Sequence, residues 1–326
     1  MKVRWGIMGP GNISHRFMAS LNQLSDAEFV ACASETPGRA EAFAKQYGAA
    51  KWYTSYEDLA ADPEVDAIYI ATTNQKHLEC ALAAIKHKKP ILCEKPLTPN
   101  AKQAQQMIEA ARKNDVFLME AMWSRFFPIM EELKKHLHRI GDIKVITGDF
   151  TYTKPGYSVD EITYRGFNPE LAGGGLIDVG IYVLSFACFV LGKTPISASG
   201  LATMSSTGID IHSVGVFGFD NGVICSAYSG MNAPGTSEAT IYGDKGHIRL
   251  DRFFQSDTMT VCVDGESETI TAAFDAPGFQ YEILEVHRCM AQGLKESPIM
   301  PLDETLEIIK AFDNLRAQWG LSYPCD

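Results

Sequence analysis

The sequence is short of positive charge, of paired cysteines and of long apolar runs. Its 326 residues contain 29 Lys and Arg against 40 Asp and Glu, which gives a formal net charge of -11. Because binding to nucleic acid needs a basic surface, this balance argues against a nucleic-acid partner. It does not exclude a small anionic ligand, since backbone amides can hold phosphates locally.

The eight cysteines are scattered along the chain, and no two of them form a C-x-x-C pair. Several lie in apolar segments, which is typical of reduced thiols that pack as small hydrophobic side chains. We find no apolar run of bilayer-spanning length. The N-terminal residues lead directly into a strand-like segment and show no signal-peptide cleavage site. We therefore expect a cytoplasmic protein with no membrane partner.

Metal-ligand patterns are also missing from the sequence. None of the eight histidines lies in H-E-x-x-H or a comparable spacing. His136 and His138 are too close in sequence to share one face of a helix. No G-x-S-x-G segment occurs, which removes the α/β-hydrolase interpretation. We expect no metal site.

Length and hydrophobic content indicate two domains. At 46% hydrophobic residues the chain is long enough for two cores, because a single core stops growing at about 250–300 residues. Over the first 120 residues short apolar strands alternate with helical segments, which is typical of a parallel sheet covered by helices. We expect strands at 3–8, 28–33, 65–71, 90–93 and 116–119. We expect one helix from the glycine turn to about residue 24 and further helices at 39–47, 77–87 and 101–113.

The pattern changes after about residue 140, where closely spaced strands lean toward alternating polarity. Turn sequences such as Asp220-Asn221-Gly222 separate them, which predicts an antiparallel or mixed sheet. One long helix is expected at 176–191 and a final helix at 303–319. We expect the later strands at 144–152, 197–204, 211–219, 223–229, 238–242 and 247–250.

These patterns predict an α/β protein with two domains. Residues 1–122 are expected to form a Rossmann domain, a doubly wound parallel sheet that binds NAD(P). Residues 123–326 are expected to form an α+β domain with a large, mostly antiparallel open sheet for substrate binding and dimerisation. Helix 303–319 could pack back toward the Rossmann domain.

One face of the second sheet carries alternating apolar residues, for example Val214, Val216 and Phe219. An isolated domain would leave these side chains in water. Burial against a second copy of the chain would cover them, so we expect a homo-oligomer, a dimer or a tetramer, formed through this sheet.

A glycine-rich turn, Gly9-Pro10-Gly11-Asn12-Ile13-Ser14, follows the first expected strand. In this G-x-G-x-x-S pattern the first glycine permits a tight turn, and the second lets backbone amides approach a pyrophosphate. Serine at the last position is still small enough for helix and strand to pack closely. The strand before and the helix after the turn favour a dinucleotide site over a ligand-free turn.

The choice between NAD and NADP stays open. The second strand ends on Ser34-Glu35, about 25 residues after the glycine turn, as the dinucleotide fingerprint requires. Glu35 could accept hydrogen bonds from a ribose 2′-hydroxyl and would repel a 2′-phosphate, which favours NAD. Ser34 and Arg39 could instead donate to a 2′-phosphate, which favours NADP.

Two further segments carry candidate catalytic groups. Glu94 and Lys95 end an expected parallel strand, where ligands of such sheets bind, although a surface ion pair there is common. Asp178 and Tyr182 lie four residues apart, so an α-helix would place them on one face. A phenol can move a proton in alcohol–carbonyl chemistry, and a nearby ammonium lowers its pKa. Alternatively, Asp178 only interacts favourably with the dipole at the start of the helix, and Tyr182 is a half-buried side chain without a catalytic role.

Together these segments resemble the Gfo/Idh/MocA oxidoreductases in order and spacing. The resemblance rests on Gly9-Pro10-Gly11, Ala71–His77, Glu94-Lys95-Pro96 and Gly173–Tyr182, and it extends over essentially the whole chain. The run Glu120–Pro128, together with tyrosine at the end of Gly173–Tyr182, resembles the branch that acts on trans-dihydrodiols and D-xylose.

The resemblance implies a role for each matched residue. Tyr182 would be the general acid/base and Asp178 a carboxylate that positions the substrate. Lys95 would contact the nicotinamide ribose and the substrate hydroxyl, and the Lys95-Pro96 bond would be cis. Glu35 departs from NADP-preferring relatives, which usually carry arginine there. The cofactor-binding residues would be Gly9, Gly11, Asn12, Ile13, Ser34, Glu35, Arg39, Thr72, Thr73, Asn74, His77, Glu94, Lys95, Trp123 and Arg125.

We expect an enzyme that uses NADP or NAD to transfer a hydride to or from a CH–OH carbon. The substrate would be a small sugar, polyol or cyclic trans-diol, and the family resemblance does not choose among these. A non-catalytic NAD(P)-binding regulator is an alternative, but it would have no use for Lys95 and Tyr182. An oxidoreductase that recycles a tightly held coenzyme between two sugars is a further alternative.

Overall fold

The computed structural model describes residues 2–326, and contacts along the chain divide it into two compact units. Unit 1 contains the residues up to Thr98 together with Lys102–Trp123 and Asp275–Thr305. Unit 2 contains Pro99–Ala101, Ser124–Phe274 and Leu306–Asp326. Each unit has its own sheet.

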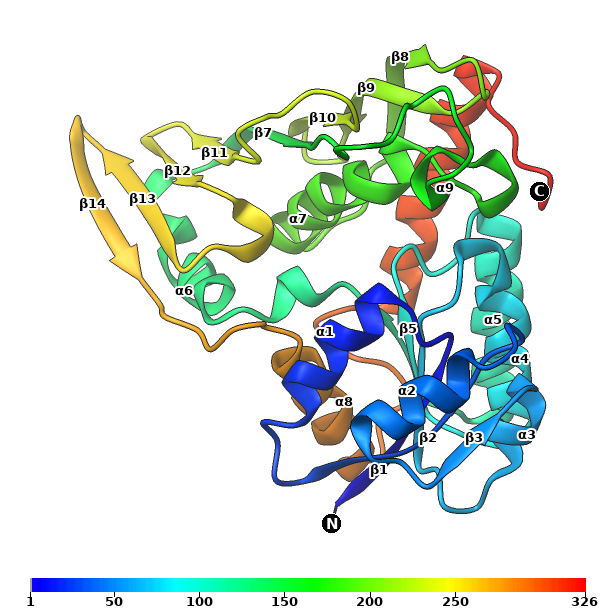
Figure 1. Ribbon diagram of the computed structural model, residues 1–326. Coiled ribbons are helices and arrows are strands. Elements are labelled where there is room, and N and C mark those ends of the chain that lie inside the picture. The colour runs from blue at the N-terminus through cyan, green and yellow to red at the C-terminus, as the bar shows by residue number, and fades with distance from the viewer. Residues whose placement is uncertain (1) are drawn as a thin grey trace. The chain divides into compact units, whose positions relative to one another are not determined.

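Unit 1 is built on a six-stranded parallel sheet in the order β3-β2-β1-β4-β5-β6 (Figure 1). This order is the doubly wound Rossmann arrangement, in which successive strands are added first on one side of β1 and then on the other. The predicted fold of the N-terminal region is therefore confirmed. The strands are β1 (Val3–Met8), β2 (Ala27–Ala33), β3 (Lys51–Tyr53), β4 (Ala67–Ile70), β5 (Ile91–Glu94) and β6 (Leu118–Ala121).

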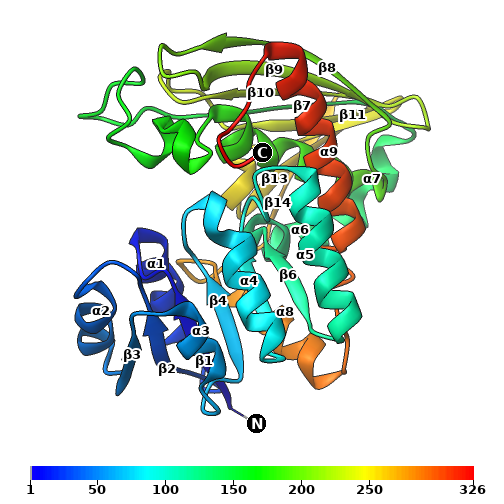
Figure 2. The same cartoon turned by 90° about the vertical axis from the view of Figure 1, so that its right-hand side faces the viewer.

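Helices cover this sheet because its central strands are apolar on both faces. All residues of β4, β5 and β6 are buried, as expected of parallel strands between helical layers. Figure 2 shows α4 and α5 running beside each other. The helices of unit 1 are α1 (Asn12–Leu21), α2 (Arg39–Tyr47), α3 (Tyr56–Ala61), α4 (His77–Lys86), most of α5 (Ala101–Asn114) and α8 (Gln280–Ala291).

The edge strand β3 and the helix α3 were not predicted. β3 has only three residues, all at least partly exposed, so it shows no periodicity. α3 is six residues long and begins at an N-cap, where the Ser55 side chain accepts a hydrogen bond from the amide of Asp58. Elements this short are recognised by their neighbours in space rather than by their pattern.

Unit 1 also contains a late segment of the chain, Asp275–Thr305. The sequence pattern predicted a single boundary, after residue 122, and did not separate this segment from the second domain. The segment contains α8, which packs against α1. Ser20 Oγ donates to Gln280 Oε1 at 2.9 Å, and Trp5 Nε1 donates to His287 Nε2 at 3.1 Å. Only contacts between residues distant in sequence assign α8 to unit 1, since its apolar face could have covered either sheet.

Unit 2 is built on an eight-stranded sheet in the order β14-β13-β12-β11-β7-β10-β9-β8. All neighbours pair antiparallel except β7 and β10, which are parallel. The predicted open, mostly antiparallel sheet is confirmed, although β13 and β14 were not predicted. The strands are β7 (Ile143–Thr151), β8 (Ser197–Met204), β9 (Asp210–Gly218), β10 (Ile224–Gly230), β11 (Ala239–Gly243), β12 (Gly246–Leu250), β13 (Thr258–Val263) and β14 (Glu266–Thr271).

The longest apolar helix of unit 2, α7 (Ile181–Leu191), packs against β7 and β10 (Figure 1). The segment Pro169–Leu191 contains an 18-residue window with a mean hydropathy of 2.0, so it is long and apolar enough by composition to cross a membrane. Our expectation that no run has this length was therefore wrong. However, 94% of its most apolar window is buried inside the structure, as in the core helix of a globular unit.

The remaining helices of unit 2 are α6 (Pro128–His136) and most of α9 (Leu302–Trp319). From Leu306 onward α9 belongs to unit 2, where Trp319 Nε1 donates to Gly200 O of β8 at 3.0 Å. A π-helix, Leu176–Gly180, precedes α7 where the sequence predicted a continuous α-helix. Short 3-10 helices lie at Asn74–Lys76, Trp123–Phe126, Leu137–Ile140, Arg165–Phe167, Pro169–Leu171 and Phe253–Gln255.

One face of the second sheet is apolar and exposed. Val214 and Val216 lie on it with exposed fractions of 43% and 42%. Phe219 was predicted to share this face but is buried, because it lies an odd number of positions from Val214 and Val216 and therefore shares the opposite, buried face with Phe217.

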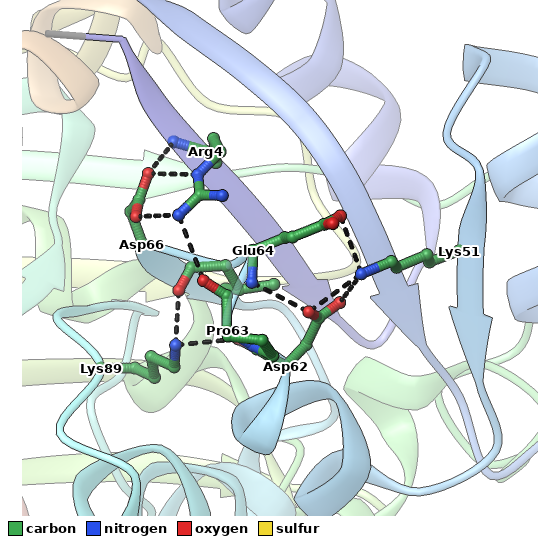
Figure 3. Close-up of polar contacts among 8 residues, drawn as sticks. Arg4, Lys51, Asp62, Pro63, Glu64, Asp66 and Lys89 are labelled. Carbon is green, nitrogen blue, oxygen red and sulfur yellow. Dashed lines mark hydrogen bonds and ion pairs between the residues drawn. The ribbon is translucent and has the colours of Figure 1, made fainter.

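A network of charged residues holds β1 to the segment before β4 (Figure 3). The Arg4 guanidinium donates to both carboxylate oxygens of Asp66, at 2.9 and 2.8 Å, and to Pro63 O at 3.1 Å. These hydrogen bonds, opposed by burial, hold the pKa of Asp66 below its usual range. Nearby, Lys51 Nζ donates to Asp62 Oδ1 at 3.0 Å. The bidentate pairing of Arg4 with Asp66 favours the ionised form of the Asp66 carboxylate.

Replacing Asp66 by asparagine should destabilise the protein, because Arg4 then loses a charged bidentate acceptor. We expect Asp66→Asn to lower the free energy of unfolding by about 1–2 kcal/mol at pH 7 in urea denaturation. The difference from wild type should shrink as the pH falls through the lowered pKa, since the wild-type carboxyl then also becomes neutral. Asp257→Asn, at an exposed aspartate, serves as the control. A stability loss in Asp66→Asn that does not change with pH would contradict the ion-pair interpretation.

Candidate active site

The glycine turn between β1 and α1 is shaped by close backbone contacts. Gly9 has a φ of +83°, and a Cβ there would lie 2.7 Å from the backbone nitrogen of Thr72. A Cβ on Gly11 would meet nothing closer than 3.9 Å, so the space above Gly11 is open. The first amides of α1, including those of Asn12 and Ile13, have no acceptor within the helix. The turn therefore fits a pyrophosphate, as the sequence predicted.

The end of β2 presents one acidic side chain. Ser34 is buried, and its Oγ accepts a hydrogen bond from Thr36 N at 3.2 Å, so it closes a turn. Glu35 is exposed and lies 3.4 Å from Lys76 Nζ, measured from its Oε2. A cavity of about 410 Å³ opens beside Glu35. Arg39 begins α2 and is exposed.

Lys76 was not among the predicted site residues, although it lies within the Ala71–His77 segment. Its ammonium also contacts Glu79 at 2.9 Å. The hydrogen bond to Glu79 and, more weakly, the charge of Glu35 raise the pKa of Lys76. Lys76 ends the 3-10 helix Asn74–Lys76, and only folding brings it to Glu35 after β2, so no local pattern indicated the pair.

His77 connects the loops that follow β4 and β5. The side chain is fully buried, with Nδ1 3.0 Å from Pro96 O and Nε2 3.3 Å from Thr72 O. The sequence predicted that His77 lines the cofactor site together with Thr72, Thr73 and Asn74. Its burial means that it holds these loops in place. Of the others, Asn74 is buried and Thr72 and Thr73 are partly exposed.

Lys95 follows the last residue of β5 in a tightly held turn. The Lys95-Pro96 peptide bond is cis, as the resemblance implied. The next residue, Leu97, donates its amide to Glu120 Oε1 at 2.9 Å, and Thr305 Oγ1 donates to Glu120 Oε2 at 2.9 Å. Glu120 at the end of β6 therefore fixes the chain that follows Lys95.

Glu94, the residue before Lys95, belongs to a group of buried acids. The Tyr69 hydroxyl donates to Glu94 Oε1. Glu282 of α8 is fully buried, and among residues 2–326 neither of its carboxyl oxygens has a hydrogen-bond partner. Burial, and then the charge of Glu94, raise the pKa of Glu282 well above its ordinary value. Burial and the charge of Glu94 both favour the neutral form of Glu282.

Trp123 and Arg125 are two residues apart but belong to different units. In unit 1 the Trp123 ring stacks on Phe279 with centroids 5.0 Å apart, and the Arg16 guanidinium lies 5.1 Å from the Trp123 ring. In unit 2 Arg125 Nε donates to Ser185 Oγ at 2.8 Å, and its NH2 donates to Ser185 O at 2.6 Å. Arg125 therefore anchors the chain to the middle of α7.

Asp178 and Tyr182 of unit 2 are both held in defined positions. Tyr152 donates its hydroxyl to Asp178 Oδ2 at 2.9 Å, and Arg165 NH2 lies 3.4 Å from Asp178 Oδ1. The Tyr182 ring packs edge-on against Phe150, with centroids 5.2 Å apart. Both Asp178 and Tyr182 are buried. A fixed carboxylate and a fixed phenol close together on one helix can orient a hydroxyl group and move its proton.

Tyr152, the residue after β7, was not among the predicted site residues. Burial and then the charge of Asp178 raise the pKa of Tyr152, so it stays a hydrogen-bond donor at neutral pH. Tyr164 instead packs edge-on against Phe167, with centroids 5.0 Å apart. No motif identified Tyr152, because β7 brings it to Asp178 from 26 residues away.

Glycines allow the π-helix that carries Asp178 to pack closely. A Cβ on Gly173 would lie 2.5 Å from Gly166 O, and one on Gly180 would lie 3.2 Å from Ser229 Oγ. π-Helical turns are rare and frequently lie at functional sites. Asp178 lies in this turn and Tyr182 in the first turn of α7, so both come from the helix that the sequence singled out.

The structure thus assembles the predicted residues in two groups. Gly9, Thr72 and Lys95 follow β1, β4 and β5 at the carboxyl edge of the parallel sheet of unit 1, where Rossmann domains bind ligands. Asp178 and Tyr182 lie together in unit 2. Within residues 2–326, no three His, Cys, Asp or Glu side chains come together in a way that could hold a metal ion.

Two family models match this chain over most of its length. Residues 3–122 match the model described as "Oxidoreductase family, NAD-binding Rossmann fold". Residues 130–249 match the "GFO/IDH/MocA C-terminal domain". The two matches correspond to the sequences of the parallel sheet and of most of the antiparallel sheet.

Characterised proteins of similar sequence cover the chain from end to end. It is 35% identical to trans-1,2-dihydrobenzene-1,2-diol dehydrogenase of Xenopus tropicalis, over 99% of this chain and 100% of the relative. It is 32% identical to the scyllo-inositol 2-dehydrogenase (NADP(+)) IolU of Bacillus subtilis (strain 168), over 99% of both chains. The aldose-aldose oxidoreductase of Caulobacter crescentus has the same fold, with a TM-score of 0.87 at 23% identity over 98% of both chains.

Proposed function

Because this chain belongs to the Gfo/Idh/MocA family of NAD(P)-dependent oxidoreductases, we propose that it oxidises a CH–OH group with Lys95 and Tyr182 as its catalytic residues. The observation that carries the proposal is the geometry around Asp178. Tyr152 and Arg165 hold this carboxylate on the same helix as the packed phenol of Tyr182. A protein that only sensed the coenzyme would have no use for this arrangement, so we favour an enzyme over a regulator.

The proposed mechanism divides the two hydrogens of a CH–OH group. When bound, the nicotinamide coenzyme accepts the hydride from carbon, or returns it in the reverse direction. Tyr182 accepts the proton of the same hydroxyl during oxidation and donates it during reduction. Lys95 would stabilise the negative charge that develops on the oxygen. Asp178 accepts a hydrogen bond from a neighbouring hydroxyl of the substrate.

The substrate class follows from this arrangement. A carboxylate beside the acid/base suits a molecule with adjacent hydroxyl groups, as in sugars, polyols and cyclic trans-diols. The named relatives act on a trans-diol and on an inositol, which supports the same class here. We propose a small molecule of this kind as the substrate.

We propose that coenzyme binding uses the carboxyl edge of the sheet in unit 1. The amides of Gly11, Asn12 and Ile13 would hold the pyrophosphate. Thr72, Thr73 and Asn74 would line the coenzyme site, and His77 would support them through its contacts with two loop carbonyls. Glu94, Trp123 and Arg125 would border the nicotinamide end.

The Glu35–Lys76 pair would set the preference between NAD and NADP. Glu35 is exposed at the end of β2, where the adenosine ribose of a Rossmann coenzyme lies. Its charge would repel a 2′-phosphate, whereas Lys76 would attract one. Because the two charges lie 3.4 Å apart, each weakens the effect of the other on the coenzyme.

We further propose that the chain forms a homodimer through the outer face of the second sheet. Leu201, Val214 and Tyr228 pair across β8, β9 and β10, so they form one apolar row on that face. Their exposed fractions are 82%, 43% and 36%. A contiguous exposed apolar row can pack against the same row of a second copy related by twofold symmetry. All eight cysteines are free thiols, which fits a reducing, cytoplasmic environment.

The catalytic assignment is tested with purified protein and a panel of aldoses, inositols and trans-dihydrodiols, by following the absorbance of reduced nicotinamide with NAD and with NADP. On the best substrate, Tyr182→Phe should lower kcat by about 10²–10⁴-fold, because it removes the proton acceptor. Coenzyme affinity should stay near wild type in that variant, whereas Lys95→Ala should reduce both. Tyr157→Phe, at an exposed tyrosine, is the control. Wild-type kcat in Tyr182→Phe would refute the assignment.

Coenzyme preference is tested by removing each charge of the pair separately. Glu35→Gln should raise the NADP-to-NAD ratio of kcat/KM by about tenfold or more, since repulsion of the 2′-phosphate is lost. Lys76→Gln should lower the same ratio. Lys113→Gln removes an exposed cation at the end of α5, outside the cavity beside Glu35, and should leave the ratio unchanged. If Glu35→Gln does not change the ratio, Glu35 does not face the ribose.

The dimer is tested by placing a charge in the apolar row. Leu201→Glu should halve the molar mass measured by light scattering after size exclusion, because two copies would bury like charges against each other. Ile162→Glu changes an exposed apolar residue outside the sheet and should leave the mass unchanged. A monomeric wild-type protein, or a Leu201→Glu variant that stays dimeric, would contradict this interface.

A further inference from the structure

Asp210, the first residue of β9, contacts the start of the helix that carries Asp178 and Tyr182. Its side chain is fully buried, and its Oδ2 accepts a hydrogen bond from the backbone amide of Leu176 at 2.6 Å. Leu176 is the first residue of the π-helix. Asp210 therefore accepts from one of the helix-start amides that lack a partner within the helix.

Gly174, within the Gly173–Tyr182 segment, makes room for this carboxylate. Gly174 has a φ of +140°, and a Cβ there would lie 2.3 Å from Asp210 Oδ1. A Cβ on Gly175 would lie 3.4 Å from Asp210 Oδ2. The Cβ of any other residue at position 174 would displace the carboxylate, so the position of Asp210 depends on the glycine.

Few polar groups surround this carboxylate. Ser213 Oγ lies 3.4 Å from Asp210 Oδ2, whereas Oδ1 has no hydrogen-bond partner among residues 2–326. The Tyr323 hydroxyl lies on the same side, 3.2 Å from the position of a Cβ on Gly174. Arg316 is the nearby cation, but its guanidinium pairs with Asp313 at 2.6 Å and with Asp326 at 2.9 Å.

These surroundings leave the charge of Asp210 only partly compensated. Burial raises the pKa of Asp210 to about 7, while the hydrogen bonds from Leu176, its own amide and Ser213, and the charge of Arg316, oppose the shift. Tyr323 stays neutral, because burial and then the charge of Asp210 raise its pKa. The carboxyl group of Asp210 therefore gains or loses its charge in the neutral pH range.

We propose that Asp210 is a positioning residue, whose negative charge at the start of the π-helix fixes Asp178 and Tyr182 for proton transfer. An ionised carboxylate accepts a stronger hydrogen bond than a neutral carboxyl group does, and the positive end of the helix dipole stabilises its negative charge. Protonation weakens this cap, two residues before Asp178 and six before Tyr182. The inference rests on the proposed catalytic role of these two residues.

Asp210→Asn tests the role of the charge while keeping the shape and an acceptor oxygen. At pH 8 and above, wild-type kcat should exceed that of the variant by about 3–10-fold, which corresponds to about one charge-assisted hydrogen bond. At pH 6 the two kcat values should converge, because wild-type Asp210 is then neutral as well. The ratio cancels ionisations that both proteins share, such as those of the catalytic groups. A ratio that is constant with pH overturns the proposal.

Gly174→Ala tests the geometry without changing any charge. Its Cβ would displace Asp210, so kcat should fall at least as far as in Asp210→Asn and should lose the same pH-dependent component. Gly222→Ala is the matched control, since Gly222 also has a positive φ, +81°, but a Cβ there meets nothing within 4 Å. Equal effects of the two substitutions would show backbone strain alone and would overturn the proposal.

Amide hydrogen exchange, followed by mass spectrometry, separates this inference from the proposed function. In Asp210→Asn at pH 8 the peptide that covers residues 174–184 should exchange faster than in wild type, and peptides from the β1–α1 turn should not change. This measurement needs no turnover, so it remains informative if Tyr182→Phe refutes the catalytic assignment. Unchanged exchange in residues 174–184 overturns the role of Asp210, and faster exchange with wild-type kcat at every pH overturns its link to catalysis.

Discussion

In each unit of this protein a glycine lies so close to a group from another part of the chain that no Cβ would fit there. In unit 1 a Cβ on Gly9 would lie 2.7 Å from the Thr72 backbone, and in unit 2 a Cβ on Gly174 would lie 2.3 Å from Asp210. These contacts lie just before the starts of α1 and of the π-helix Leu176–Gly180 that precedes α7. Because helix starts carry unpaired amides, the same contacts decide which anions each unit can hold: a ligand at α1, and the protein's own carboxylate before α7.

Buried acidic groups are the second feature that the two units share. Glu282 and Asp210 both lie in the interior with few partners, and burial raises the pKa of each. Such groups cost stability, since a hydrophobic residue of similar size would pack without the penalty. Both lie next to a proposed catalytic segment, Glu282 beside Glu94 and Asp210 beside the π-helix. Functional sites are where proteins commonly keep groups of this kind.

The two sheets could be predicted largely from local sequence patterns. Alternating strands and helices predicted the Rossmann sheet, and closely spaced strands predicted the antiparallel sheet, because hydrophobic periodicity is a local property of the chain. Elements without such periodicity, β3 and α3, were missed. The segment Asp275–Thr305 could not be assigned to unit 1, since only packing of α8 against α1 places it there.

What the sequence alone determined is the chemistry: a glycine turn for a dinucleotide, a lysine after a buried strand, and a carboxylate and a phenol on one helix. These were visible because each motif lies within about ten residues. Tertiary structure alone decided which partners hold these motifs. Tyr152 donates to Asp178, Glu120 accepts from the amide of Leu97, Lys76 pairs with Glu35, and Asp210 accepts from the amide of Leu176. The two residues of each pair come from different segments of the chain, and such pairing depends on how the whole chain packs rather than on any local pattern.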